Sequence, residues 1–198
     1  MRVLGAHSAN PALGRVLLDS IEDLEVNPLA DDPDAAPDAL AIAPYVGGSI
    51  ANRIAQEGRG GSVSVDAILD AVADSVETEV RAHVRENKAT ADEHGVRLIG
   101  YEGGQHLVAH GAAGNDEALV QKLMEANRAP RMGEIYASML DAWYEESGDD
   151  LMVLFTHIYE ATKYGMWGLL ESQADVDVGA PKYEAFRARI TALERAER

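Results

Sequence analysis

The chain has 198 residues, of which 46% are apolar and 26% charged, so it can bury a core and lacks the composition of a disordered polyelectrolyte. Its formal net charge of −17 at pH 7 makes nucleic acids and anionic membranes poor partners, because few cations are available to neutralise phosphate groups. Cysteine is absent, which excludes disulfides, thiolate metal ligands and a cysteine nucleophile. No apolar run approaches the roughly 20 residues that cross a bilayer, so we expect no membrane partner.

Four short apolar segments alternate with helical stretches along the chain. Their apolar residues are continuous rather than alternating, which is typical of strands that are buried on both faces of a parallel sheet. We predict strands over residues 2–5, 39–43, 96–101 and 151–155.

The predicted helices follow from apolar spacing and from residues that favour helix ends. After a first helix over residues 11–24, a long helix begins near Asp66, with apolar residues at intervals of three and four. Two further helices are separated at Ala129-Pro130, and the second ends near Gly148. The last helix begins at Pro181, since proline suits the first helical position.

This alternation of strands and helices predicts an α/β fold with a parallel sheet. Polar and aromatic residues follow the carboxyl end of each predicted strand, which is where a (β/α)8 barrel places its active site. A closed barrel needs eight strands, and four are predicted. We therefore predict that residues 1–198 form a single domain, the half of a TIM barrel, completed by a missing N-terminal half or by a second copy in a homodimer.

Glu102 is the most prominent candidate for a catalytic residue. It directly follows the third predicted strand, and Gly103 and Gly104 let the backbone turn there without an obstructing Cβ. Tyr45 follows the second strand in the same way, so its phenol is expected to donate a hydrogen bond to the carboxylate and hold it in its charged form. The structural alternatives are a glutamate that caps a turn and a tyrosine that covers the rim of the sheet.

Further polar and aromatic side chains in the same loops are candidates for substrate binding. Aromatic rings offer flat surfaces to the apolar faces of sugars, and imidazole and amide groups bind hydroxyls, although each of these residues also suits a purely structural role. His106 and His110 stand four residues apart, but without a third ligand we predict no metal site. The predicted substrate-binding residues are Trp167, Tyr164, His7, Asn10 and His106.

Several segments together resemble the C-terminal half of certain large bacterial glycoside-hydrolase-like barrel proteins. These proteins are related to the retaining clan that includes cellulases and β-glycosidases. The resemblance implies that the predicted strands correspond to strands five to eight, that Glu102 is the nucleophile, that Tyr45 orients it, and that Trp167 stacks on the sugar. The segments are RVLGAHSANP, ALAIAPYVGG, VRLIGYEGGQHL, PRMGEIYASMLDAWYEESG and YGMWGLLES.

The resemblance departs from the clan at the second catalytic group. Retaining hydrolysis of O-glycosidic bonds needs two carboxyl groups about 5–5.5 Å apart, and the acid/base glutamate of the clan ends a fourth strand that has no counterpart here. We therefore expect hydrolysis only from a complete barrel and an inactive chain by itself, without a cofactor and with an oligosaccharide or polysaccharide as ligand. The alternatives are a non-catalytic saccharide-binding protein and a half-barrel assembly module. The resemblance also implies a secreted full-length parent.

Overall fold

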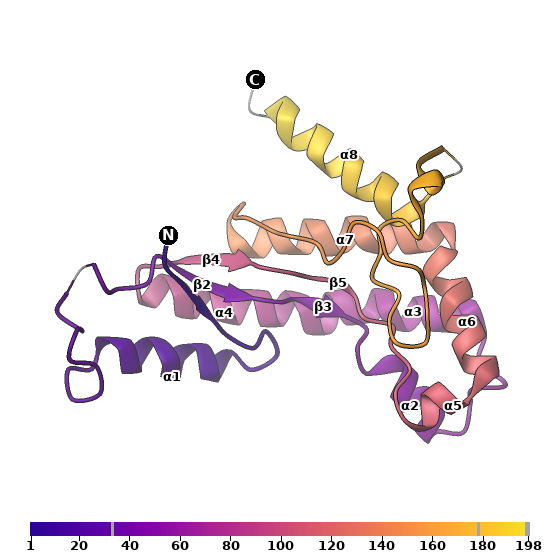
Figure 1. Cartoon of the computed structure of the whole chain (residues 1–198), viewed down its shortest axis with the longest axis horizontal. Coiled ribbons are helices and arrows are strands. Elements are labelled where there is room, and N and C mark those ends of the chain that lie inside the picture. The colour runs from indigo at the N-terminus through magenta and orange to yellow at the C-terminus, as the bar shows by residue number, and fades with distance from the viewer. Residues whose placement is uncertain (33, 178, 197–198) are drawn as a thin grey trace.

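Three of the four predicted strands lie side by side in one parallel sheet. The computed structural model describes residues 1–32, 34–177 and 179–196. The strand order is β1-β2-β4, with Leu40 of the central strand opposite Leu4 on one side and Leu98 on the other. These strands are β1 (Val3–Gly5), β2 (Ala39–Ile42) and β4 (Arg97–Gly100) (Figure 1).

A second, two-stranded parallel sheet continues the line of β2 and β4. It consists of β3 (Tyr45–Val46) and β5 (Gly104–Gln105), with Tyr45 opposite Gly104. The segments that follow β2 and β4 therefore continue to run side by side for a few more residues. This second pairing brings the segments that carry Tyr45 and Glu102 next to each other.

The prediction of a half TIM barrel is wrong. The described strands form one three-stranded and one two-stranded sheet, and no barrel is closed. The segment 151–155, predicted as the fourth strand, is joined to β4 by a single parallel bridge between Gly100 and Met152. It is extended, and Val153 and Phe155 donate backbone hydrogen bonds to Gly100 and Gly103, but no regular strand forms.

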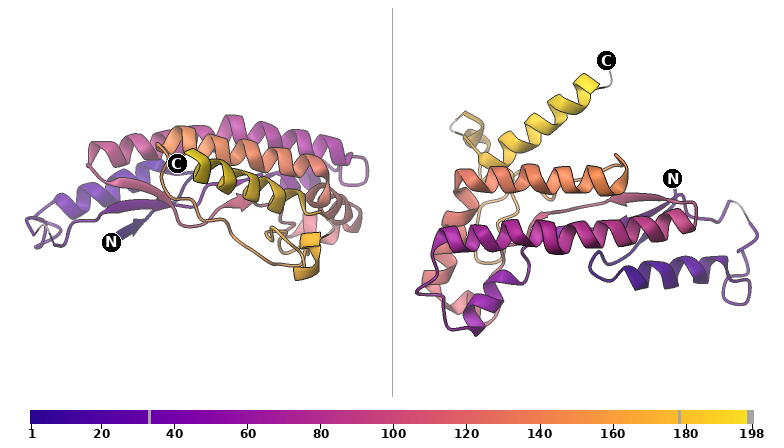
Figure 2. Two further views of the ribbon diagram at one scale, coloured as in Figure 1. Left: turned by 90° about the horizontal axis from the view of Figure 1, so that it is seen from above. Right: turned by 180° about the vertical axis from the view of Figure 1, so that it is seen from behind.

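Helices form a layer on one face of these sheets (Figure 2). A π-helical turn, η1 (Val76–Val80), joins α3 to α4 into one long rod, and a 3-10 turn, η2 (Gln173–Asp177), precedes the last helix. The helices are α1 (Pro11–Glu22), α2 (Ile50–Gln56), α3 (Val65–Ser75), α4 (Arg81–Glu93), α5 (Ala112–Asn115), α6 (Glu117–Arg128), α7 (Pro130–Ser147) and α8 (Pro181–Ala196).

Local chemistry fixes several of the helix ends, of which those at Pro130 and Gly148 were predicted. Ser64 caps α3, its side chain accepting a hydrogen bond of 3.1 Å from the Ala67 amide. Helix α7 begins at Pro130 and ends at Gly148, which has the positive φ of 78° common in glycine at this position. Because these ends depend on neighbouring residues only, the sequence was sufficient to locate them.

The core lies between the sheet and the helical layer. Leu40 and Ile42 of β2 are fully buried in one cluster with Trp143 of α7, whereas Ala39 and Ala41 point to the opposite face, where only a small separate cluster forms. Parallel sheets are usually covered on both faces, so this one is unusual in having helices on a single side. None of the helices in the described part of the chain is both long and apolar enough for a membrane crossing.

Candidate functional site

The predicted catalytic pair comes together where β2 and β4 end. The phenol of Tyr45 is a hydrogen-bonding and electrostatic neighbour of the Glu102 carboxylate. Burial, and then the nearby negative charge of Glu102 with its hydrogen bond, raise the pKa of Tyr45, so the phenol keeps its proton and acts as a donor. Both side chains are partly buried. The carboxylate therefore lies beside the phenol and still reaches solvent.

A continuous cluster of aromatic rings adjoins this pair. The ring of His106 meets the edge of Tyr45, with 5.1 Å between centroids, and lies 5.9 Å from Trp167. Trp167 in turn packs edge-on against Tyr159 at 5.3 Å and Phe155 at 5.7 Å. These separations and tilted angles are typical of favourable aromatic pairs. We call these five residues together with Glu102 the aromatic cluster.

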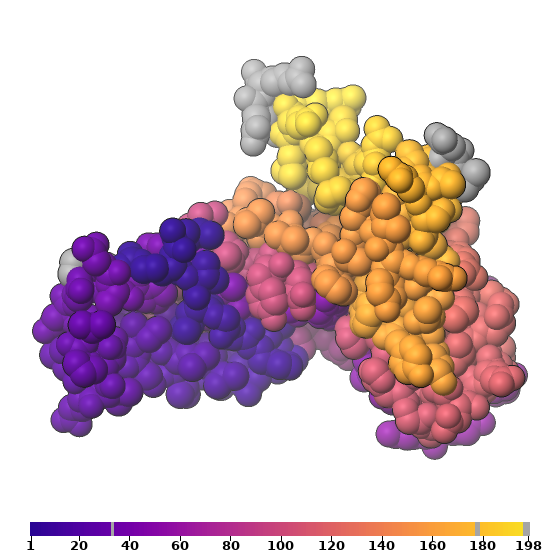
Figure 3. Space-filling model, viewed as in Figure 1, coloured from indigo at the N-terminus to yellow at the C-terminus, as the bar shows by residue number. Residues whose placement is uncertain are grey.

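Residues 156–170 form the loop that carries Trp167 into the cluster. Its two limbs are joined by backbone hydrogen bonds, among them Thr156 N–H to the Trp167 carbonyl at 3.2 Å and Tyr159 N–H to the Leu170 carbonyl at 3.0 Å. In the space-filling view the loop, coloured orange, lies on the surface beside the pink segment that follows β4 (Figure 3). The cluster therefore combines rings from segments far apart in sequence.

Two features of Trp167 describe its packing. Its ring lies directly over Gly165, where any Cβ would overlap the indole, so glycine is required for this placement. Its indole N–H is buried and has no acceptor among the described residues, which leaves one strong donor unsatisfied. The neighbouring residues Phe155 and Tyr159 are 39% and 36% exposed, so both are accessible to solvent.

Three predicted binding residues lie outside the aromatic cluster. His7 and Asn10 follow β1, which is separated from β4 by β2, and both are exposed. Tyr164 stands at the tip of the 156–170 loop, 63% exposed, with the Lys163 ammonium 5.3 Å from its ring. No interaction among the described residues joins these three side chains to Glu102 or Trp167.

Phe155 was missed by the sequence analysis, and so was a buried polar network beneath the aromatic cluster. Phe155 belongs to an apolar run that gives no sign of a site. In the network, Gln105, which precedes His106, donates through Nε2 to the Asn127 side-chain oxygen at 3.0 Å and to the Met166 carbonyl. Its own side-chain oxygen accepts from the Leu107 amide at 2.6 Å.

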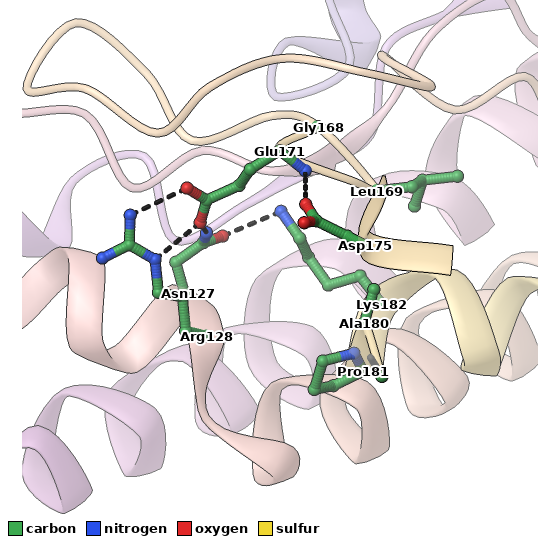
Figure 4. Close-up of a pocket in the computed structure, with 10 residues that line it drawn as sticks. Asn127, Arg128, Gly168, Leu169, Glu171, Asp175, Ala180, Pro181 and Lys182 are labelled. Carbon is green, nitrogen blue, oxygen red and sulfur yellow. Dashed lines mark hydrogen bonds and ion pairs between the residues drawn. The ribbon is translucent and has the colours of Figure 1, made fainter. Parts of the chain in front are cut away.

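Lys182 joins this network from the first turn of α8 (Figure 4). The lysine is 3% exposed and donates to Asn127 at 2.8 Å and to the Met166 carbonyl at 2.7 Å. Since Met166 adjoins Trp167 and Gln105 adjoins His106, the network fixes the backbone on both sides of the aromatic cluster. A single lysine after Pro181 gave no sequence signal, because it looks like a surface residue at a helix start.

His106 gives the cluster a pH dependence. Burial lowers the pKa of His106, and the nearby His110 lowers it further. The unfolded chain therefore binds a proton at this residue more readily than the folded chain, and folding stability should fall as the pH falls below the ordinary histidine value of about 6.5. We expect the loss of unfolding free energy between pH 7.5 and 5.5 to be smaller in His106→Gln than in the wild type. The exposed His7→Gln variant serves as the control, and equal losses in all three proteins would contradict the assignment.

Comparison with known proteins identifies no relative: no protein-family model, curated protein or solved structure matches the chain. Among the described residues, no group of three or more histidine, aspartate or glutamate side chains is arranged to hold a metal ion. The resemblance to retaining glycosidases therefore remains a prediction. The geometry of the aromatic cluster is the basis for any functional proposal.

Proposed function

We propose that this protein binds saccharides at the aromatic cluster. The observation that carries the proposal is the contiguity of Tyr45, His106 and Trp167 beside the Glu102 carboxylate. Aromatic rings stack on the apolar faces of sugar rings, while a carboxylate accepts hydrogen bonds from hydroxyl groups. Partial exposure of Phe155 and Tyr159 supports the same interpretation, because their rings remain open to a ligand.

Glycoside hydrolysis is the second candidate, favoured by the pairing of Tyr45 with Glu102. A carboxylate with a neighbouring tyrosine phenol suits a nucleophile, but retaining cleavage needs a second carboxyl group that holds a proton. The resemblance assigns only one of these two groups to the chain. Binding without cleavage is therefore the function that the geometry supports best.

We expect the Trp167→Ala variant to bind cellohexaose at least about tenfold more weakly than the wild type, since removal of a central aromatic anchor commonly costs more than 1.4 kcal/mol. Gly165→Ala should have a similar effect because the new Cβ displaces the indole without removing it. Isothermal titration calorimetry measures both effects.

Tyr164→Ala is the matched control, since it removes an exposed ring from the same loop without touching the aromatic cluster. Its affinity should stay within about twofold to threefold of the wild type. Incubation with p-nitrophenyl β-cellobioside separates the two candidate functions. Release of nitrophenol that disappears in Glu102→Gln would establish hydrolysis, and a wild type that binds none of cellohexaose, laminarihexaose or maltohexaose would refute the binding proposal.

A further inference from the structure

A cavity of about 280 Å³ lies between α6, the start of α8 and the segment 168–175. Its lining includes Asn127 and Arg128 from α6, Glu171 and Asp175, and Lys182 from α8 (Figure 4). The size suits a small metabolite rather than an oligosaccharide. The cavity is distinct from the aromatic cluster, with which it shares none of its lining residues.

Three of the four charged groups that line this cavity already have partners, either in an ion pair or in hydrogen bonds with backbone amides. Arg128 makes a bidentate ion pair with Glu171, both hydrogen bonds being 2.7 Å long. Asp175 accepts hydrogen bonds from the backbone amides of Glu171 and Ser172 at 2.9 and 2.7 Å. These groups therefore serve the local structure and hold the wall of the cavity in place.

Lys182 is different, because its hydrogen-bond partners are both neutral. Its amine donates to the Asn127 side-chain oxygen and the Met166 carbonyl, and no carboxylate of the described residues lies within ion-pair distance of it. The ring of Tyr136 lies 5.6 Å from the amine. Burial lowers the pKa of Lys182 to about 7, with Glu171 acting weakly in the opposite direction. Much of the amine is therefore neutral and nucleophilic at neutral pH.

The hydrogen bonds of Lys182 are not needed to satisfy the network. Gln105 Nε2 already donates to both oxygens that Lys182 contacts. A buried lysine that costs desolvation and duplicates existing donors has no structural role that an apolar side chain would not fill. Such a lysine at the wall of a cavity is a candidate for a reaction with a ligand bound there.

The charges around the cavity favour an uncharged ligand. Arg128 and Glu171 offset each other as an ion pair, which leaves the negative charge of Asp175 to repel anions. The chain as a whole carries a net charge of −17, which adds to this repulsion. A cationic ligand would be repelled by the protonated fraction of the Lys182 amine. A neutral carbonyl compound avoids both conflicts and matches the reactivity of a neutral amine.

We propose that Lys182 is a reactive amine that forms an imine with a small neutral aldehyde in this cavity. The unprotonated Nζ adds to the carbonyl carbon and gives a carbinolamine, which loses one molecule of water to form the C=N bond. No oxidant or reductant takes part. This activity is separate from saccharide binding and does not depend on it.

Reductive trapping tests the proposal on the intact wild-type protein. Glycolaldehyde and sodium cyanoborohydride are added at pH 7, the hydride donor converts any imine to a stable secondary amine, and peptide mass mapping locates the modified residues over time. The chain provides three internal controls, since ordinary lysines are almost fully protonated at this pH. The lysines to be compared are Lys88, Lys122, Lys163 and Lys182.

We expect modification of Lys182 to be at least tenfold faster than that of each other lysine, with the N-terminal amine mapped separately. The preference should vanish in denaturant, because it depends on burial of the amine. Lys182→Arg should lose the fast site and leave the rates at the other three lysines unchanged. A folded wild type in which Lys182 reacts no faster than the other lysines would overturn the proposal.

Discussion

Replacement of Lys182 by methionine is expected to raise the free energy of unfolding at pH 7 by about 2–4 kcal/mol. The pKa of Lys182 falls from 10.5 to about 7 on folding, so the unfolded chain binds more protons between these values. The contribution of this amine to the stability of the wild type therefore rises with pH across this window and is lowest at and below pH 7. Methionine has no charge to bury, and Gln105 keeps both former acceptors of the lysine hydrogen-bonded.

Urea unfolding at several pH values between 7 and 9.5 measures this effect. The wild type should gain up to about 1.4 kcal/mol per pH unit from this group, and Lys182→Met should lack that gain. Lys88→Met is the matched control because the Lys88 side chain on α4 is 27% exposed and paired with Asp92. A variant that is less stable than the wild type at pH 7 would mean that Lys182 stabilises the fold.

The second large effect is expected at Gly168. A Cβ at this position would lie within 2.6 Å of both backbone N and O of Tyr159 and would overlap the Leu170 carbonyl oxygen. These are backbone atoms that cannot rotate away, so the two limbs of the 156–170 loop must separate. We expect Gly168→Ala to cost about 3 kcal/mol or more of unfolding free energy and to disturb Trp167, which lies beside it.

Gly61→Ala provides the control for the second prediction. No atom lies within 4 Å of a Cβ at Gly61, so alanine there should change stability by less than about 1 kcal/mol. Denaturant unfolding gives the stability of each variant, and near-ultraviolet circular dichroism reports the environment of the tryptophans. Equal stability of the two variants would show that the loop tolerates separation of its limbs.

Proximity of Tyr45 and Glu102 could be predicted because parallel strands that are neighbours end at the same edge of a sheet. The two residues follow β2 and β4, which pair as predicted, and the short β3–β5 pairing maintains the alignment. The same argument failed for His7 and Asn10. They follow an edge strand that is one strand further away, and strand order is not encoded in any local pattern.

The sequence by itself determined the features that depend on neighbouring residues: three of the strands, the break at Ala129-Pro130 and the glycine end of α7. Only the tertiary structure decided that segment 151–155 forms one bridge instead of a strand, because strand pairing depends on a partner that is distant in sequence. That partner contains Gly100 and Gly103, whose lack of side chains leaves room for the Met152 side chain. The tertiary structure also decided that helices cover one face of the sheet and that Lys182 is buried. Burial of the lysine results from the packing of α8 against α7 and from hydrogen bonds to Asn127 of α6 and to the Met166 carbonyl. No local spacing relates these segments.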